Sequence, residues 1–495
     1  MKHQEISIPE AFDRACLQYK DKTFIFHGQE TYSYGRAGRM VNGFAEFLAN
    51  NQISSGDKVC LVLPRRPELV LAFLGAVKIG AVPAPANYTL GHKEYNDFIK
   101  RVAPRVIVID SEYVRFMDSD LFYDKNILKI IVGAEKSGFI PWPETCFESD
   151  FTTGIYPSLD QIAYLNFTTG SSGLPKGAIA THAQLFWNTM SAIKAFDLTD
   201  KDVLLCMFAS FAHPHELFCR PIFTGGSLVI QENVNPRTIV RAINKHGVTC
   251  MMGLSPMYEM IAAHCSTMDL SPLRIAESGG MYTRPDISTD FHDKFGLPIL
   301  SVWGSTETSG IALANTPQSY KTDGSMGTAC PFYEVKVVDD QDQELAIGEI
   351  GELIFKGKGV IKGYEEGVDY PAKDGWYYSG DMGHRDEQGF FYFAERKSGM
   401  IKVAGLKVYP LQVELVIKEF PGIKEVAVIG VKERRHGMVP KAFLVFEESV
   451  ELPDFEEIKR FCRERLANYM IPKIFEVLDE LPKIGSGKIN KKVLS

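Results

Sequence analysis

The stretch AYLNFTTGSSGLPKGA, residues 163–178, joins a short apolar run to a loop of glycines and hydroxyl side chains. A helical pattern follows Thr181, so the order predicts a strand, a loop and a helix. Glycines let backbone N–H groups approach phosphate oxygens, hydroxyls add donors and a lysine adds charge. We therefore interpret the loop as an anion-binding segment rather than as a solvated Gly/Ser-rich turn. The candidate binding residues are Thr168, Thr169, Gly170, Ser171, Ser172, Gly173 and Lys176.

The loop does not follow the two common nucleotide-binding patterns. A Walker loop reads GxxxxGK[ST], whereas here Pro175 and Lys176 precede Gly177. The dinucleotide pattern GxGxxG is also absent. Nothing in this loop therefore demands the transfer of a γ-phosphoryl group.

Outward from the loop, short apolar runs alternate with longer helical patterns from about residue 22 to 310. This alternation predicts parallel βαβ units, hence an α/β fold with covered sheets. Ligands in such folds bind beyond the carboxyl ends of the strands, where we expect the loop to lie. The runs interpreted as strands are VCLVLP (59–64), RVIVID (105–110), LLCMF (204–208), SLVI (227–230), TCMMG (249–253) and PILSVWG (298–304).

The pattern changes after about residue 323, where β-branched and aromatic residues alternate with Gly and Asp turns. This predicts a mostly β subdomain over about 323–396. From residue 397 a basic, glycine-bearing stretch leads into two strands and a helix. We therefore expect a large N-terminal domain, 1–396, and a small α+β C-terminal domain, 397–495, on a hinge.

Composition narrows the class of protein. The chain has 495 residues, 45% of them hydrophobic and 23% charged, which is ordinary for an enzyme of more than one domain. A formal charge of −8 argues against a nucleic-acid-binding surface. Nine scattered cysteines without a CxxC pair favour reduced thiols. With no signal peptide and no apolar run long enough to span a bilayer, we expect a cytoplasmic protein.

FTTGSSGLPKGA (167–178) resembles the phosphate loop of the adenylate-forming superfamily, which contains acyl-CoA synthetases, adenylation domains of peptide synthetases and firefly-type luciferases. Further motifs of the superfamily recur in the same order, so the resemblance covers nearly the whole chain. VWGSTET (302–308) resembles its aromatic–Gly–x–Thr–Glu segment. The resemblance implies an ATP-binding segment of Trp303, Gly304, Ser305, Thr306 and Glu307. In it the aromatic side chain stacks on adenine, the threonine approaches the phosphate, and the glutamate helps to hold Mg²⁺.

Two later segments complete the implied nucleotide site. WYYSGDMG (376–383) resembles the YxTGD motif with Ser379 in place of threonine, and implies that Asp381 binds both ribose hydroxyls. ERKSGMIKVAGLKVYPLQVE (395–414) resembles the segment between the two domains, and implies that Arg396 contacts ribose or phosphate. Many relatives carry Gly where this chain has Glu395 and an acidic residue where it has Ser398.

The hinge should lie at about 397–399. Ser398, Lys402 and Gly405 are the residues implied for the hinge and for contacts with coenzyme A.

LPKIGSGKINKKVL (481–494) resembles the PKTxxGKIxR terminus of the superfamily, and matches Lys488 to the lysine that enters the active site. The implied reaction is attack of a carboxylate on the α-phosphate of ATP. It forms an acyl-adenylate and releases pyrophosphate, and the acyl group then passes to a thiol. Positioning and charge neutralisation would supply the catalysis, with Thr306, Glu307 and Lys488 as the catalytic residues.

The acceptor expected from the resemblance is coenzyme A. GLKVYPLQVE (405–414) is more similar to acyl-CoA synthetases than to peptide-synthetase domains, and no carrier domain follows Lys488. The phosphopantetheine thiol of a separate carrier protein is the alternative. A luciferase-like monooxygenase and a non-enzymatic nucleotide-binding regulator are rival classes, the second disfavoured because Glu307, Asp381 and Lys488 are all present.

The acid pocket is implied by two segments. FASFAHPHELF (208–218) lies where the superfamily places a pocket wall, and Ala212 stands where amino-acid-activating domains carry Asp, which argues against an α-amino acid. His213 and His215 gate the pocket, recognise a polar substituent, or are structural histidines. ESGGMYT (277–283) would form the opposite wall. Its residues Gly279, Gly280 and Met281 leave room for an aromatic or medium-chain acid. The oligomeric state expected is a monomer or a homodimer.

Overall fold

The computed structural model describes residues 4–87, 90–168, 176–207, 213–232, 234–365, 367–403, 405–433, 437–447, 452–483 and 489–494. The chain forms two compact units. The first unit consists of Met1–Glu334 and Phe355–Tyr377, and the second of Val335–Ile354 and Tyr378–Ser495. The domain limits at residues 396 and 397 stay a prediction.

A parallel sheet in the order β4-β3-β5-β6-β7 occupies the N-terminal part of the first unit. Successive residues of its strands face two different cores: Val59 and Leu61 pack with α2 and α3, whereas Cys60 and Val62 pack with α4. Both faces are therefore covered, which explains the continuous apolar runs of these strands. The elements are α2 (Tyr34–Asn50), β3 (Lys58–Val62), α3 (Pro67–Lys78), β4 (Val82–Pro85), α4 (His92–Val102), β5 (Val106–Asp110), η1 (Val114–Phe116), α5 (Ser119–Tyr123), β6 (Leu128–Val132), β7 (Ile140–Pro141) and α6 (Trp142–Thr145).

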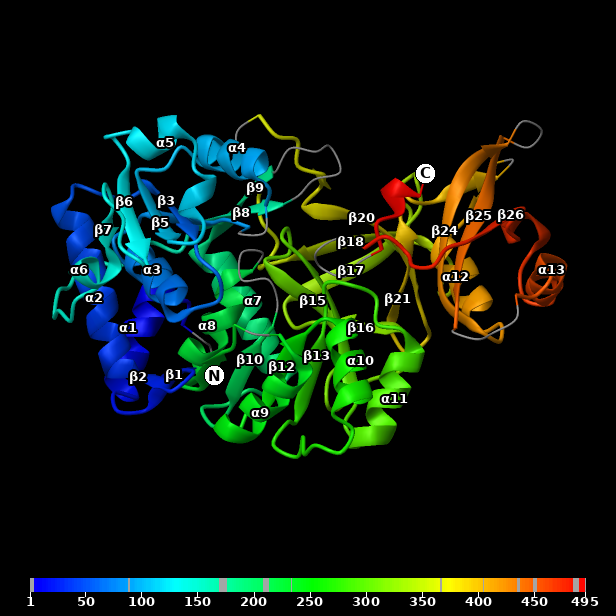
Figure 1. Cartoon of the computed structure of the whole chain (residues 1–495), viewed down its shortest axis with the longest axis horizontal. Helices are drawn as coiled ribbons and strands as arrows, with labels where there is room; N and C mark the ends of the chain where they lie inside the picture. The colour runs from blue at the N-terminus through cyan, green and yellow to red at the C-terminus, as the bar shows by residue number, and fades with distance from the viewer. Residues whose placement is uncertain are drawn as a thin grey trace. The chain divides into compact units, whose positions relative to one another are not determined.

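A larger sheet carries the site segments of the first unit. Its order is β16-β15-β14-β13-β12-β10-β11-β1-β2, and the neighbours from β14 to β1 are parallel. Figure 1 shows α9, α10 and α11 along β10, β12 and β13. Met251 packs with these helices and Met252 with the core of α1 and α8, so this sheet is also covered on both faces. The strands are β1 (Thr23–His27), β2 (Glu30–Ser33), β10 (Val203–Cys206), β11 (Ser227–Ile230), β12 (Cys250–Gly253), β13 (Ile275–Ser278), β14 (Ile299–Ser305), β15 (Gly310–Ala314) and β16 (Ser325–Ala329). The helices are α1 (Ile8–Gln18), α7 (His182–Ala195), α8 (Pro214–Thr224), α9 (Pro236–His246), α10 (Ser255–His264) and α11 (Pro285–Phe295).

The surroundings of the glycine-rich loop differ from the sequence prediction. β8 (Ile162–Thr168) pairs antiparallel with β9 (Lys176–Thr181) in a two-stranded sheet, and α7 starts only after β9. The loop therefore joins a hairpin and does not follow a strand of a parallel sheet. KGAIAT has six residues, which are too few for a strand pattern to be distinguished from the preceding loop in the sequence.

The part of the sequence predicted to be rich in β structure forms the strands that come after β16 in the chain. β17 (Tyr333–Val338), β18 (Gly351–Gly357), β20 (Trp376–Arg385) and β21 (Phe391–Arg396) are neighbours in that order, and β19 (Ala372–Lys373) pairs with β20. The last part of the chain forms a sheet in the order β23-β22-β25-β24, with β26 beside β25. Its elements are β22 (Ile401–Val403), β23 (Leu406–Val408), α12 (Pro410–Lys418), β24 (Ile423–Glu433), β25 (Gly437–Phe446), α13 (Phe455–Arg463), η2 (Asn468–Met470), β26 (Ile474–Val477) and η3 (Lys491–Val493).

The fold class predicted from the sequence is confirmed. Parallel βαβ units build the first unit, and strands with two helices build the C-terminal part of the second. All nine cysteines are free thiols, eight of them buried. In the described ranges, no helix has the length and apolar character that crossing a membrane requires.

A buried ion pair joins α8 to β13 in the core of the first unit. Arg220 Nη1 donates to Glu277 Oε2 at 2.6 Å and Nη2 to Oε1 at 3.2 Å. Both side chains are buried, and Arg220 Nη2 is also 3.8 Å from Glu216 Oε1. The pair connects the helix that begins beside His213 to the strand that precedes Gly279. It therefore holds together the two segments predicted to line the acid pocket.

Arg220→Met should destabilise the protein strongly, because it leaves the Glu277 carboxylate buried without a cation. The expected loss in the free energy of unfolding is about 3–5 kcal/mol, measured by urea denaturation. Arg14→Met, which removes a largely exposed pair with Glu10, should cause a much smaller loss. Equal losses in the two variants would contradict this role of the buried pair.

The start of α7 holds a buried histidine. His182 is 1% exposed, and its Nδ1 accepts a hydrogen bond from the Ile8 backbone N–H at 3.4 Å. Burial lowers the pKa of His182 to about 4. Between pH 6.5 and 4 the unfolded chain therefore binds a proton that the folded chain does not, so stability falls as the pH falls through this window.

His182→Gln should remove this part of the pH dependence. From pH 7 to pH 4 the free energy of unfolding of the wild type, relative to the variant, should fall by as much as about 3 kcal/mol. Urea denaturation at several pH values measures it. His264→Gln, at an exposed position on α10, is the matched control and should keep the wild-type slope. Identical slopes for wild type and His182→Gln would contradict the assignment.

Candidate functional site

The phosphate loop is only partly within the described residues. Thr169, Gly170, Ser171, Ser172 and Gly173 lie outside them, as does Lys488 near the C-terminus. Thr168 is the last residue of β8 and Lys176 the first of β9, so the hairpin fixes both ends of the loop. The Lys176 Nζ lies 5.5 Å from the centre of the Tyr364 ring.

Glu307 is a buried carboxylate at the end of β14. The chain turns from β14 into β15 through residues 306–309, and the Thr308 hydroxyl holds the turn by donating to the Gly310 carbonyl at 2.6 Å. Glu307 is 8% exposed and accepts a hydrogen bond from the Tyr364 hydroxyl. In the described part of the chain, no lysine or arginine nitrogen lies within ion-pair distance of this carboxylate.

Phenol groups surround Glu307 in the first unit. The pKa values of Tyr364, Tyr370 and Tyr377 are all raised, first by burial and then by the charge of Glu307. These side chains are therefore hydroxyl donors and carry no charge of their own. A carboxylate that faces neutral donors is available to a cation.

The donor set fits magnesium. Mg²⁺ is usually held by one or two carboxylates, with water and substrate phosphates completing its octahedron. Glu307 supplies one buried hard-oxygen ligand, and the described residues contain no group of three His, Cys, Asp or Glu side chains that could hold a metal without substrate. This chain therefore suits a cation that arrives with a phosphate ligand.

Trp303 is stacked on a second aromatic side chain. Its indole lies on the ring of Phe355 in β18, with centroids 4.1 Å apart and planes 4° from parallel. Phe355 is fully buried and therefore supports the indole from behind. Phe355 carried no signal in the sequence, because GELIF reads only as a buried strand.

Backbone contact explains Gly304. A Cβ at this position would lie 2.4 Å from the Gly310 carbonyl oxygen and 2.8 Å from Ile311 Cα, so β14 and β15 approach too closely for a side chain. Ser305 pairs with Gly310 in the same ladder. Thr306 follows in the turn, where its carbonyl accepts from the Ser309 N–H at 3.1 Å. The predicted segment 303–307 is thus held mainly by its backbone.

The two candidate histidines differ in their surroundings. His215 is fully buried, with one ring nitrogen 3.2 Å from the Tyr164 hydroxyl and the other 2.8 Å from the Ser309 carbonyl. His213 has a buried Nδ1 that has no hydrogen-bond partner among the residues described. Burial lowers the pKa of His213 to about 4, although the charge of Glu307 opposes the shift. His213 is therefore neutral near pH 7 and keeps one ring nitrogen free.

The predicted acid-pocket segments meet one edge of the larger sheet. β10, β12, β13 and β14 are parallel, so the segments that follow them start from the same edge. His213 follows β10, and Gly279, Gly280 and Met281 follow β13. The Gly279 N–H donates to the Gly253 carbonyl at 3.2 Å, which fixes the start of the second segment.

Asp381 and Arg396 lie opposite each other in the second unit. They are paired residues of β20 and β21, and the Arg396 Nε is 2.8 Å from Asp381 Oδ1. Asp381 is 2% exposed. Ser379 supports it, because its hydroxyl accepts from the Asp381 N–H at 3.0 Å and donates to the Leu353 carbonyl at 2.6 Å. The predicted ribose-binding carboxylate is therefore rigidly held beside its arginine.

The residues predicted for the hinge and for coenzyme A lie on turns and short strands of the second unit. Ser398 is exposed in the turn after β21, where the Gly399 N–H donates to the Arg396 carbonyl at 2.8 Å. Lys402 is exposed on β22, and Gly405 has a φ of +87° between β22 and β23.

An ion-pair cluster that the sequence did not reveal holds the C-terminal segment in the second unit. Lys491 Nζ lies 2.8 Å from Glu414 Oε1 on α12 and 3.4 Å from Glu395 Oε2 on β21. Burial raises the pKa of Glu414, which the charge of Lys491 opposes. Lys491 is three positions after Lys488, so this cluster fixes the chain just beyond the predicted catalytic lysine.

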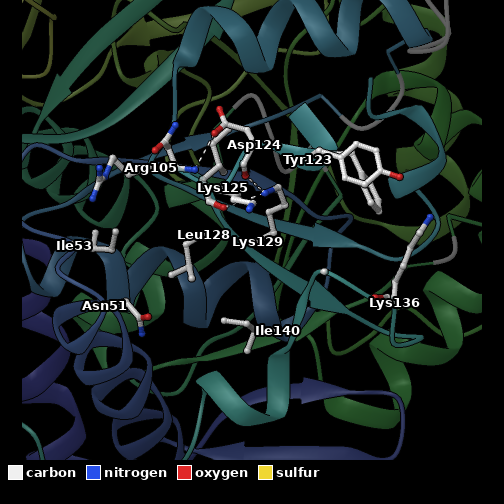
Figure 2. Close-up of a pocket in the computed structure, with 15 residues that line it drawn as sticks. Asn51, Ile53, Arg105, Tyr123, Asp124, Lys125, Leu128, Lys129, Lys136 and Ile140 are labelled. Carbon is white, nitrogen blue, oxygen red and sulfur yellow. Dashed lines mark hydrogen bonds between the residues drawn. The ribbon is translucent and has the colours of Figure 1, made fainter. Parts of the chain in front are cut away.

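The pocket in Figure 2 lies elsewhere in the first unit. Its lining includes Arg105, Asp124, Lys125, Lys129 and Lys136, around the start of β5 and β6. None of the predicted site residues that the structure describes lines it. It is therefore not the site indicated by the motifs.

Comparisons with known proteins agree with the geometry. The model of the AMP-binding enzyme family matches residues 12–365, and the model of the AMP-binding enzyme C-terminal domain matches residues 412–488. The chain is 30% identical over 477 residues to a feruloyl-CoA synthase of an Amycolatopsis species, covering 95% of this chain and 94% of that protein. It is 30% identical over 519 residues to a long-chain-fatty-acid–CoA ligase of Bacillus subtilis, covering 97% and 92%.

A solved structure gives the same fold. The crystal structure of ATP-bound MatB from Rhodopseudomonas palustris superposes with a TM-score of 0.88 at 24% identity, covering 99% of this chain and 98% of that one. The first family model includes the motifs at 167–178 and 302–308, and the second ends at Lys488. The chain belongs to the AMP-binding enzyme family.

Proposed function

We propose that the protein is an AMP-forming carboxylate–CoA ligase. It converts a carboxylic acid and ATP to an acyl-adenylate and pyrophosphate, and then transfers the acyl group to the thiol of coenzyme A, releasing AMP. The observation that carries this proposal is the similarity to CoA ligases over nearly the whole chain, at 30% identity. The free, mostly buried cysteines suit the cytoplasm, where ATP and coenzyme A are abundant.

The first unit supplies the phosphate and adenine contacts. Lys176 and the loop before it bind the β- and γ-phosphates, Thr306 approaches the α-phosphate, and the indole of Trp303 stacks on adenine. Glu307 holds Mg²⁺, which neutralises phosphate charge when it is bound. The supporting observation is that Glu307 is buried among neutral phenols, with Tyr364 between it and Lys176.

The second unit supplies the ribose contacts and the catalytic lysine. Asp381 accepts hydrogen bonds from both ribose hydroxyls, and Arg396 contacts ribose or phosphate beside it. Lys488 stabilises the charge on the pentavalent α-phosphate and on the attacking carboxylate oxygen. Each of these groups positions the reactants or neutralises charge, so the protein itself needs no nucleophile.

The acid is aromatic or of medium chain length. His213 contacts the acid or gates its entry, because its Nδ1 has no hydrogen-bond partner among the described residues, whereas both nitrogens of His215 are bonded within the protein. Gly279, Gly280 and Met281 form the opposite wall. One named relative is a feruloyl-CoA synthase, whose acid is aromatic, and the other is a long-chain-fatty-acid–CoA ligase, whose acid is aliphatic. Ser398, Lys402 and Gly405 serve the hinge and coenzyme A.

A panel of carboxylic acids, assayed with and without coenzyme A, tests the reaction. Aromatic and medium-chain acids should release pyrophosphate from ATP, and AMP release should become catalytic only when coenzyme A is added. Products are measured by chromatography. If AMP release instead requires a phosphopantetheine carrier protein, the thiol of that carrier protein is the acceptor. Absence of acid-dependent pyrophosphate release across the panel would contradict the proposed function.

Lys488→Ala should lower carboxylate-dependent ATP–pyrophosphate exchange by at least about 100-fold, because it removes charge stabilisation from the transition state. Thioester formation from supplied acyl-adenylate and coenzyme A should be largely retained. Lys483→Ala is the matched control, since Lys483 is a nearby, half-exposed lysine paired with Glu425. An equal loss of both half-reactions in Lys488→Ala would contradict the assigned role.

A further inference from the structure

Tyr364 connects two predicted ligand contacts that lie far apart in the sequence. Its hydroxyl donates to Glu307 Oε1, and the Lys176 ammonium lies 5.5 Å from its ring centre. The hydroxyl of Tyr364 thus contacts the carboxylate predicted to bind magnesium, and its ring lies near the lysine predicted to bind phosphate. A lysine near an aromatic ring is attracted by the ring quadrupole.

The segment that carries Tyr364 is fixed to β9. Tyr364 forms an antiparallel bridge with Ala178, the Ile179 N–H donates to the Gly363 carbonyl at 3.2 Å, and the Glu365 N–H donates to the Gly177 carbonyl at 2.8 Å. A Cβ on Gly177 would lie 2.4 Å from Glu365 Oε2, so the two segments are in close contact. Any shift of β9, which begins at Lys176, must therefore shift Tyr364 as well.

The same segment is fixed to Glu307 and to the smaller sheet. The Ile361 N–H donates to the Glu307 carbonyl at 2.8 Å. The Glu365 carboxylate lies 3.1 Å from Lys58 Nζ and 3.8 Å from Arg101 Nε. Tyr364 is therefore held between three parts of the first unit and has little freedom to leave Glu307.

The position of Tyr364 decides what Glu307 can bind. A buried carboxylate next to a lysine would form an ion pair and lose much of its affinity for a metal. Here the phenol ring lies against the lysine and its hydroxyl satisfies one carboxylate oxygen. The hydrogen bond holds the carboxylate in one orientation, and a carboxylate has more lone pairs than these phenol hydroxyls use.

We propose that Tyr364 is a positioning residue that keeps Glu307 oriented for Mg²⁺ and keeps Lys176 from pairing with it. Lys176 then remains available to the phosphates, and Glu307 to the metal. This inference rests on the proposed function, since it assigns a role within the same nucleotide site.

Tyr364→Phe removes the hydroxyl and keeps the ring. In the full-length protein, the Mg²⁺ concentration that half-saturates ATP–pyrophosphate exchange should rise about tenfold, because a hydrogen bond to a charged group is lost. The KM for the acid should stay near the wild-type value. Binding of Mn²⁺ in the presence of ATP, followed by electron paramagnetic resonance without acid or turnover, should weaken by a similar factor.

Tyr370→Phe is the matched control. Its hydroxyl donates to the Ile361 carbonyl at 2.8 Å, and its ring packs edge-on against Tyr364. Tyr370→Phe loses a structural hydrogen bond in the same segment but none to the Glu307 carboxylate, so its Mg²⁺ dependence should match that of the wild type. Equal Mg²⁺ shifts in Tyr364→Phe and Tyr370→Phe would mean that Tyr364 is merely structural.

A double-mutant cycle separates this inference from the proposed function. In a Glu307→Gln background, Tyr364→Phe should cause no further weakening of Mn²⁺ binding, because its partner carboxylate is gone. Additive losses in the double mutant would overturn the inference, as would unchanged Mn²⁺ binding in Tyr364→Phe. Tyr364→Leu, which also removes the ring, should in addition raise the KM for ATP by freeing Lys176 to pair with Glu307. A wild-type protein without acid-dependent exchange would instead contradict the function itself.

Discussion

The carboxylate of Glu307 is buried at the end of β14 without a cation among the described residues that surround it, and the first unit is built to hold it there. Burying an unpaired charge is unfavourable, and a protein normally avoids it by pairing the group or by protonating it. Here a phenol hydroxyl partly compensates the charge. A dication that arrives with ATP would offset the remaining charge. Because the carboxylate is already buried, part of the desolvation that ligand binding requires is complete before the ligand binds.

Buried polar side chains hold the turn that carries Glu307 through hydrogen bonds to its backbone and to one another. Asn188 on α7 donates to the Ile311 carbonyl at 3.0 Å and to the Tyr333 hydroxyl at 2.9 Å, and Tyr333 in turn donates to the Thr308 carbonyl at 2.7 Å. His215 bonds the Ser309 carbonyl. Satisfied buried networks of this kind make a region rigid and specific. The ring of His215 belongs to this network, whereas the Nδ1 of His213, just before the same helix, has no hydrogen-bond partner among the described residues.

Local patterns in the sequence predicted the strands, the helices and the motif residues, because each depends on neighbours a few positions away. Strands of the parallel sheets are apolar on both faces, and residues such as Glu307 and Asp381 stand in short recognisable segments. The partners of these residues could not be found in the same way. Phe355 behind Trp303, and Tyr364 beside Glu307, meet their partners only through sheet pairing between distant segments. β9 was missed for a different reason, since six residues are too few to show a period.

Two departures from the pattern of the relatives are compensated locally. Ser379 replaces threonine, but the structure uses only the hydroxyl, which bonds the Leu353 carbonyl and the Asp381 N–H. A methyl group would add packing and no hydrogen bond, so the substitution leaves the support of Asp381 intact. Glu395 stands where many relatives have glycine, and its carboxylate is shared between Lys491 and the Arg396 N–H, at 3.4 and 2.8 Å. The Glu395 carboxylate thus has two partners. Through Lys491 it connects the residue before Arg396 to the segment that follows Lys488. In this chain the departure at Glu395 therefore strengthens the second unit at the place where two predicted active-site residues are anchored.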